Sequence, residues 1–332
     1  MIAFTRSRLD ALFRAFESRK IAVIGDLMLD KYIWGRVSRI SPEAPVPVVD
    51  VVSETTRFGG AANVALNVQS LGAGVIPIGV VGEDDAGRTL MQLFRDKGFP
   101  VDGIIGTPQR PTTVKTRIIA ESQHVVRIDW EVKEGIPARI QKSLAQFAKG
   151  IMAHVDAVIL EDYNKGLLVP GLIRELIDIA NREGKMTLVD PKFEHFFAFR
   201  NVTLFKPNRK EAADRLGFSL DSPEALARAG AQLLEKLDSR AVMITLGEDG
   251  MILFPRGEEP VHVPTRAMRV HDVSGAGDTV IATMAVAMTA GANLKEAATL
   301  ANHAAGIVCG EVGIVPIEKT RLKESMLAEM SD

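Results

Sequence analysis

Short apolar runs that end at glycine or polar residues recur along the chain and predict buried strands. They lie within the segments KIAVIGD, GVIPIGVVG, VDAVILED, MTLVDP, VTLFKPN and RAVMITLG. Apolar residues at helical spacing occur between most of these runs, at about 88–97, 168–183 and 224–237, and also at the N-terminus around Leu9, Leu12 and Phe16. Near-continuous apolar strands alternating with helices are typical of a mostly parallel sheet covered on both faces.

Two regions depart from this pattern. The segments VPVVDVVSETTRF and TTVKTRIIAESQHVVRIDWE alternate polar and apolar residues, which indicates half-exposed strands. We expect strands from about 31–58 and 108–131 to form a small β lid beside the main sheet. No repeat, low-complexity tract or long Gly/Ser linker divides the sequence, so we expect one domain over residues 1–332. The uncharged stretch 58–82 contains asparagines, a proline and glycines, and it predicts a small-residue helix followed by a buried strand, not a membrane span.

The composition is that of an ordinary soluble globular protein. The 332 residues carry a formal net charge of −2, which gives no reason to expect a nucleic-acid or membrane partner. The single cysteine, Cys309, excludes an intrachain disulfide and a cysteine-cluster metal site. The first residues show no apolar signal-peptide core. These features together predict a cytoplasmic protein.

Polar residues follow several predicted strands, where ligands of open α/β sheets collect. One such segment, GEDDAGRT at 82–89, nearly matches a phosphate-binding P-loop. However, Arg88 stands where that loop needs lysine, and Asp84 and Asp85 would repel phosphate. We therefore expect an ordinary strand-to-helix turn, with one of these aspartates near the helix cap.

The segment DVSGAGDT at 272–279 has more suitable chemistry for phosphate. Gly275, Ala276 and Gly277 can turn N–H groups toward an anion, and the long apolar segment that follows predicts a buried helix. Asp278 would repel a phosphate, but it suits a general base that takes a proton from an attacking hydroxyl. Spacing alone leaves open that Asp278 only caps the helix.

This segment resembles the C-terminal signature of the ribokinase-like (PfkB) carbohydrate kinases. FGGAANVALNVQSLG at 58–72 resembles their N-terminal signature, KPNRKE at 206–211 their Asn-x-x-Glu motif, and GDLMLD at 25–30 their sugar-binding strand end. The resemblance spans nearly the whole chain in family order. It implies a ribokinase-like three-layer α/β/α fold, with a mostly parallel central sheet and a small β-strand lid, and a kinase that uses ATP and Mg²⁺.

The resemblance also implies residue roles. Asp278 would be the general base, and Gly275, Ala276 and Gly277 the anion hole. Asn208 and Glu211 would organise Mg²⁺ through water, although the same pair could be a helix capping box. The sugar hydroxyls would meet Asp30, Gly59, Gly60 and Asn63. Thr245, Gly247 and Asn302 would wall the ribose and adenine of ATP. His303 and Cys309 are expected to be packed helix residues.

Further details resemble the D-glycero-β-D-manno-heptose 7-phosphate kinases of bacterial lipopolysaccharide biosynthesis. They are GDLMLDKYIWGRVSRISPEAPVPVV, RPTTVKTR, EDYNKGLL and VDPK. A phosphorylated substrate needs cations far from Asp278, and the candidates are Arg110, Lys115, Arg117, Arg127, Lys165 and Lys192. Asp162 and Asp190 are candidates for orienting neighbouring hydroxyls, lysines or the metal.

Several alternatives remain open at this stage. They are another ribokinase-like enzyme, acting on a ketohexose phosphate or an unphosphorylated sugar, and a regulator that kept the fold and lost catalysis. In the bifunctional relatives a nucleotidyltransferase domain follows, whereas this sequence has no His-x-Gly-His pattern, so we expect a separate enzyme to perform the adenylyl step. Family members often pair their lids, so we expect a homodimer formed through the lid.

Overall fold

The computed structural model describes residues 4–121, 123–265, 272–311 and 313–330. Nine strands form the main sheet, in the order β13-β12-β11-β10-β9-β8-β1-β4-β5. Their bounds are β1 Lys20–Gly25, β4 Gly74–Gly82, β5 Ile104–Thr107, β8 Ala157–Glu161, β9 Met186–Asp190, β10 Leu204–Phe205, β11 Ala241–Thr245, β12 Met251–Pro255 and β13 Val261–Val263. The strands from β11 to β5 pair in parallel, while β12 and β13 pair antiparallel at one edge. The predicted mostly parallel sheet is confirmed.

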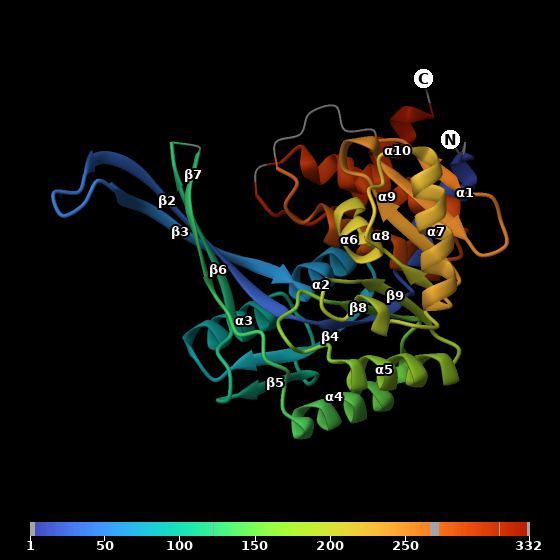
Figure 1. Ribbon diagram of the computed structural model, residues 1–332, viewed down its shortest axis with the longest axis horizontal. Coiled ribbons are helices and arrows are strands. Elements are labelled where there is room, and N and C mark those ends of the chain that lie inside the picture. The colour runs from blue at the N-terminus through green and yellow to red at the C-terminus, as the bar shows by residue number, and fades with distance from the viewer. Residues whose placement is uncertain (1–3, 122, 266–271, 312, 331–332) are drawn as a thin grey trace.

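Helices cover both faces of this sheet (Figure 1). One layer contains α1 Arg6–Phe16, α2 Ala61–Ser70, α3 Asp85–Asp96, α8 Ala276–Thr289, α9 Leu294–Cys309 and α10 Lys319–Glu329. The other contains α4 Ala138–Ile151, α5 Pro170–Arg182, α6 Arg209–Leu216 and α7 Pro223–Leu237. In β1, Ile21 and Val23 pack into the first layer and Ala22 and Ile24 into the second. This alternation explains why the strand reads as a continuous apolar run.

A second sheet of four strands projects from the body, as Figure 1 shows. Its order is β3-β2-β6-β7, with β2 at Leu27–Ile40, β3 at Pro47–Gly60, β6 at Thr113–Ala120 and β7 at Gln123–Trp130. Strands β2 and β6 are parallel, and each has an antiparallel partner on its outer side. The small β lid expected from the sequence is this sheet. Its strand β2 begins at Leu27, earlier than the lid boundary of about residue 31.

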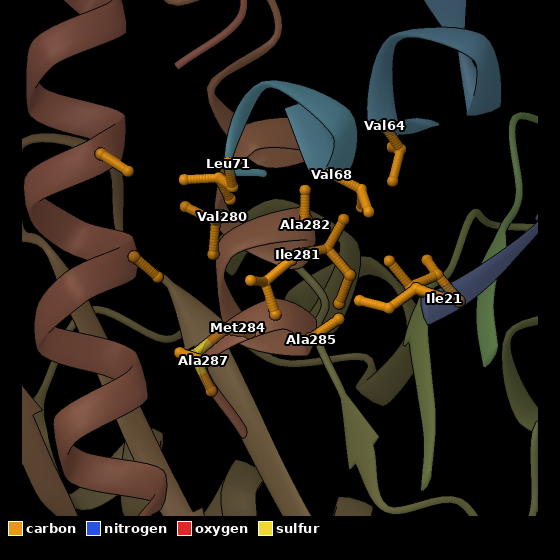
Figure 2. Packing of buried hydrophobic residues seen from close by; sticks show 14 of the residues in the cluster. Ile21, Val64, Val68, Leu71, Val280, Ile281, Ala282, Met284, Ala285 and Ala287 are labelled. Atoms are coloured by element: carbon orange, nitrogen blue, oxygen red, sulfur yellow. The ribbon is translucent and has the colours of Figure 1, made fainter. Parts of the chain in front are cut away.

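Helix α8 is buried along almost its whole length. It packs against α2, with Val280 beside Leu71 and Ala282 beside Val68 (Figure 2). The uncharged stretch 58–82 forms the end of β3, the helix α2 and the strand β4, so the predicted helix followed by a strand is present. Within the described ranges, no helix is long and apolar enough to cross a membrane.

Candidate active site

A cavity of about 470 Å³ opens where α8 begins, beside the carboxyl ends of β9, β10 and β11. Its lining comes from segments far apart in the sequence: Tyr163, Asp190, Lys192, Lys206, Asn208, Arg209, Lys210, Glu211, Thr245, Leu246, Gly247, Val273, Gly275, Gly277 and Asp278. The cavity thus unites the glycine loop, the Asn-x-x-Glu motif and the residues after β11. Its position is the one expected for a ligand of an open α/β sheet.

The glycine loop and the start of α8 form one corner of this cavity. Gly275 adopts a left-handed conformation, with φ of 81°, just before the helix, and this conformation is accessible to glycine without strain. An α-helix leaves its first N–H groups without partners inside the helix. The N–H of Ala276 donates to the carbonyl of Val273 at 3.2 Å, whereas Gly277 lines the cavity. The helix start therefore offers an anion both dipole and backbone donors.

Asp278 lies in the first turn of α8 and is only 4% exposed. It is not the residue that caps the helix, because that place belongs to Gly275. The side-chain amide of Asn63 donates to Oδ2 at 2.7 Å, and the Tyr163 hydroxyl donates to Oδ1 at 2.7 Å. Two donors from different elements therefore hold the carboxylate at the cavity.

The surroundings of Asp278 favour a carboxylate that can exchange a proton near neutral pH. Burial raises the pKa of Asp278 to about 6, the hydrogen bonds from Asn63 and Tyr163 oppose this rise, and Asp190 adds to it. A carboxylate with such a pKa is mostly ionised at pH 7 and binds a proton readily. This property suits a general base.

Three buried carboxylates meet at the cavity, and two of them, Asp190 and Asp278, line it. Glu161, Asp190 and Asp278 place oxygen atoms within 4.8 Å of one another. The buried ammonium of Lys206 lies 2.6 Å from Asp190 and balances one negative charge. Burial, followed by the charges of Asp190 and Asp278, raises the pKa of Glu161 well above its ordinary value. The cluster therefore disfavours a negative charge on Glu161.

The Asn-x-x-Glu motif begins helix α6. The Asn208 side chain accepts the N–H of Glu211 at 2.8 Å, and Glu211 Oε2 accepts the N–H of Asn208 at 2.8 Å. This arrangement is the capping box considered from the sequence. Glu211 Oε1 also accepts a bond from the Lys192 ammonium at 2.8 Å. Both motif residues line the cavity, so capping does not remove them from a ligand.

The residues predicted to contact ATP divide into two groups. Thr245 and Gly247 line the cavity at the end of β11. Asn302 is not part of the lining, and its amide donates to the carbonyl of Pro264 at 2.7 Å. His303 and Cys309 are buried on α9, in line with the expected packing roles.

The predicted sugar-binding residues lie where β2 and β3 leave the body. Asp30 of β2 lies opposite Arg57 of β3 in the strand register and is 3% exposed. Its Oδ1 accepts a bond from Arg117 at 2.7 Å. A Cβ on Gly59 would lie 2.7 Å from Asp30 Oδ2, so the glycine makes room for this carboxylate. Gly60 has φ of 55° and ends β3 directly before α2, which carries Asn63.

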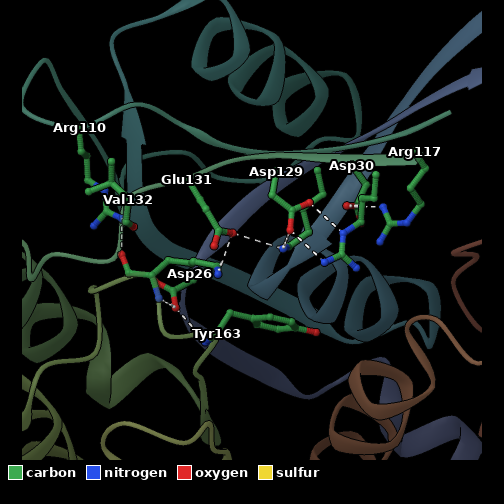
Figure 3. Close-up of polar contacts among 11 residues, drawn as sticks. Asp26, Asp30, Arg110, Arg117, Asp129, Glu131, Val132 and Tyr163 are labelled. Atoms are coloured by element: carbon green, nitrogen blue, oxygen red, sulfur yellow. Dashed lines mark hydrogen bonds and ion pairs between the residues drawn. The ribbon is translucent and has the colours of Figure 1, made fainter. Parts of the chain in front are cut away.

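The candidate cations for a substrate phosphate all have partners in this structure. Lys115 lies 3.4 Å from both Asp129 and Glu131, and Lys165 lies 2.8 Å from Glu131 (Figure 3). Arg127 binds Asp129, and Lys192 binds Glu211. Arg110 donates to the carbonyls of Val132 and Lys165, which is a structural role. An incoming phosphate would have to displace a carboxylate from these lysines or from Arg127.

Several residues of the site were not among the sequence candidates, including Tyr163, Lys206, Glu161 and Asp26. Tyr163 and Lys206 lie within EDYNKGLL and KPNRKE, two of the segments that resemble the family. The sequence of these segments does not show where either side chain points. Asp26 accepts the N–H groups of Tyr163, Lys165 and Leu167 at 2.8, 3.1 and 3.3 Å and so holds the loop after β8 (Figure 3).

Asp162 is not part of the cavity lining, and its Oδ1 accepts the N–H of Asn164 at 2.8 Å. Burial and the nearby charge of Asp26 raise the pKa of Asp162 to about 7. Asp190, whose carbonyl accepts the N–H of Asp162 at 3.0 Å, does line the cavity and is the partner of Lys206.

The chain is similar in sequence to curated proteins over most of its length. The chain is 42% identical over 321 residues to the bifunctional protein HldE of Geobacter sulfurreducens, covering 97% of this chain and 66% of the relative. It is 46% identical over 301 residues to the protein of that name in Caulobacter vibrioides, covering 90% and 62%. The chain therefore spans about two thirds of the length of these relatives.

Solved structures show the same fold. An Arabidopsis thaliana ribokinase complexed with ribose and ATP superposes with a TM-score of 0.73 at 20% identity, covering 93% of this chain and 98% of that one. Phosphofructokinase-2 from Escherichia coli gives 0.78 at 19% identity, covering 95% and 99%. The predicted ribokinase-like fold is confirmed. A family model described as pfkB family carbohydrate kinase matches residues 18–320, and this chain belongs to that family.

Proposed function

We propose that this chain is an ATP-dependent kinase that phosphorylates the C1 hydroxyl of D-glycero-β-D-manno-heptose 7-phosphate to the 1,7-bisphosphate. The observation that carries the kinase activity is Asp278, a buried carboxylate oriented by two donors at the start of α8 and beside the cavity. The choice of sugar rests on the heptose-kinase motifs in the sequence and on the similarity to HldE proteins.

Asp278 acts on the acceptor hydroxyl in this proposal. Its carboxylate takes the proton as the C1 oxygen forms a bond to the γ-phosphorus of ATP, and the bond from that phosphorus to the oxygen of ADP breaks. The anomeric hydroxyl is more acidic than an ordinary alcohol, so a carboxylate base is adequate. The N-terminal amides of α8 and the Lys206 ammonium face the phosphoryl group and offset its charge.

The residues of the cavity fit a magnesium ion held through water. Magnesium prefers oxygen ligands and keeps several waters. Asn208 and Glu211 offer such oxygens at the cavity wall, but each already accepts a backbone N–H in the capping box. Contact through bridging water leaves the capping box intact. When bound, the ion would supply positive charge to the phosphates of ATP.

The sugar would lie between Asp278 and the base of the lid. Asp30, Gly59, Gly60 and Asn63 are the proposed contacts for its hydroxyls, since they surround the junction of β2, β3 and α2. The 7-phosphate would then lie toward the lid cations, where it competes with Asp129 and Glu131 for Lys115 and Lys165. The second candidate, a kinase of another sugar, uses the same base and loop.

An ADP-release assay over a panel of sugars tests this proposal. The panel contains the heptose 7-phosphate, the unphosphorylated heptose, fructose 6-phosphate and ribose. We expect turnover only with the first, and we expect Asp278→Asn to keep ligand binding while turnover falls by about 10²-fold or more. Turnover that does not need the 7-phosphate would rule out the heptose assignment, and unchanged turnover in Asp278→Asn would remove Asp278 from its role.

The lid is the proposed dimer interface. Its edge strands β3 and β7 expose backbone groups, and edges of this kind are usually covered. Large apolar side chains stand exposed on the lid: Ile40, Val46, Val51, Val52, Val125, Val126, Ile128 and Trp130. A second copy of the chain pairing lid to lid would cover them. We place the enzyme in the cytoplasm, where ATP is available and a lone cysteine stays reduced.

Light scattering at working concentration tests the dimer. We expect a dimer for the wild type and a monomer for Trp130→Glu on the lid. The matched control is Phe193→Glu, which changes an exposed aromatic residue outside the lid and should leave the dimer intact. A wild type that is monomeric at every working concentration contradicts the proposal.

A further inference from the structure

Tyr163 and Asn63 bond to different oxygen atoms of the proposed base, Asp278. The Tyr163 hydroxyl donates to Oδ1 of Asp278 at 2.7 Å, while Asn63 donates to Oδ2. Tyr163 also lines the cavity, and the Lys192 ammonium lies 5.1 Å from the centre of its ring. The tyrosine therefore touches the base, the cavity and one of its cations.

The loop that carries Tyr163 is held in place by a buried carboxylate. Asp26, which follows β1, accepts three backbone N–H groups from this loop, beginning with that of Tyr163 itself. Asn164 takes a left-handed conformation, with φ of 53°, directly after Tyr163. Arg110 binds the carbonyl of Lys165 from the lid side. These contacts fix the position of the Tyr163 backbone, which limits the positions that its side chain can take.

Two donors on two different oxygen atoms determine the orientation of a carboxylate. Rotation of the Asp278 carboxylate would break the bond from Asn63 or the bond from Tyr163. Each oxygen accepts one of these bonds and has a second lone pair. A lone pair thus remains available to an acceptor hydroxyl while both donors stay in place.

We propose that Tyr163 is a positioning residue for phosphoryl transfer, and that its hydroxyl fixes the Asp278 carboxylate in the orientation that receives the proton of the acceptor hydroxyl. This inference rests on the proposed kinase function. Geometry of this kind matters because proton transfer needs the base within hydrogen-bond reach of its proton. Asn63, at the other oxygen, completes the same arrangement.

The charged groups around Asp278 give the hydroxyl a second effect. Asp190 of β9 opposes a negative charge on Asp278, and Lys192 favours it. Glu161 of β8 has a carboxyl oxygen within 4.8 Å of both carboxylates. The Tyr163 hydroxyl also favours the charge on Asp278 because it donates to the ionised form. Burial and the adjacent carboxylates raise the pKa of Tyr163 well above its ordinary value, so the hydroxyl keeps the proton that it donates.

Tyr163→Phe removes the hydroxyl and keeps the ring. We expect kcat to fall about 10- to 100-fold, because a hydrogen bond to a charged group is lost, with little change in the KM for ATP. The acid limb of the pH profile should move upward by about one unit, a shift that a purely structural role would not produce. Tyr32→Phe is the matched control at the only other tyrosine of the chain and should leave the acid limb in place.

A measurement that needs no turnover separates this inference from the proposed function. Carbon-13 NMR of the Asp278 carboxyl, assigned with Asp278→Asn, should show a higher pKa in Tyr163→Phe than in the wild type. If the wild type phosphorylates no sugar but the NMR shift is present, the kinase proposal fails and the Tyr163–Asp278 link stands. An unmoved carboxyl pKa together with an unmoved acid limb overturns the inference, even if kcat falls.

Discussion

The amide of Asn63 donates to Oδ2 of Asp278 at 2.7 Å, although 215 residues separate them in the chain. Asn63 is on α2 and Asp278 on α8, so the packing of these helices brings the two together. Asn63→Ala removes this donor. We expect a loss in kcat of about 10- to 100-fold in steady-state assays. Asn181→Ala, which removes an exposed amide bonded to the Asn201 carbonyl, is the control and should retain wild-type kcat.

The pKa of Asp278 determines how activity depends on pH. Burial raises it to about 6, and the proposed base works only when ionised. Activity should therefore be present above pH 6 and be lost as the pH falls through 6. The measurement is kcat/KM as a function of pH, with stability checked across the range. A profile flat down to pH 4 would exclude Asp278 as the base.

Lys206 should stabilise the fold as well as the cavity. Lys206 is 2% exposed, and its ammonium lies 2.6 Å from the buried Asp190. Lys206→Met leaves that carboxylate buried without its partner, and we expect a loss of about 3–5 kcal/mol in the free energy of unfolding. Urea denaturation measures this loss.

Lys210→Met is the matched control for Lys206→Met. Lys210 also pairs with an aspartate at 2.6 Å, but its side chain is 82% exposed. The expected change is less than about 1 kcal/mol. Equal losses in the two variants would show that burial of the Lys206–Asp190 pair has no consequence.

Gly275→Ala should lower kcat by more than its backbone strain alone would explain. Gly275 and Gly291 both have positive φ, and alanine at either costs about 1–2 kcal/mol of stability. Only at Gly275 would the new Cβ meet a site residue, Asn63 Nδ2 at 3.1 Å, whereas nothing lies within 4 Å at Gly291. We expect up to about 100-fold lower kcat for Gly275→Ala alone. If Gly291→Ala loses as much kcat, the loss comes from strain and not from Asn63.

Removal of divalent cations should abolish turnover. We expect EDTA to stop the reaction and added Mg²⁺ to restore it, with a higher Mg²⁺ requirement in Glu211→Gln. Glu296→Gln is the control, because Glu296 forms the same type of capping box at α9, outside the cavity lining. It should lose stability without a change in Mg²⁺ requirement. Turnover that persists in EDTA would contradict the metal proposal.

Much of the fold could be predicted from the sequence because its strands are buried on both faces. A strand such as β8, Ala157–Glu161, reads as a continuous apolar run, and its polar end marks the ligand edge. The lid was harder to delimit, since β2 starts apolar and continues as an exposed strand to Ile40. The hydrophobic pattern changes along that strand, although it remains one strand throughout.

The site was predictable where a motif specifies backbone geometry and less so where side chains meet. Gly275 and the capping box at Asn208 depend on local sequence, and both are visible in the letters. The contact between Tyr163 and Asp278 depends on a loop held by Asp26, which is 137 residues away from Tyr163 in the chain. The pairing of Lys115 with Glu131 likewise requires the register of β6 and β7.

Only Asp26 separates β1 of the main sheet from β2 of the lid. Asp26 is therefore both the joint between the two sheets and the residue that holds the Tyr163 loop. We expect a change in the angle between the sheets to alter the position of that loop. Length changes near the tip, around residues 41–46, leave that joint untouched, whereas an insertion beside Asp26 disturbs both sheets at once.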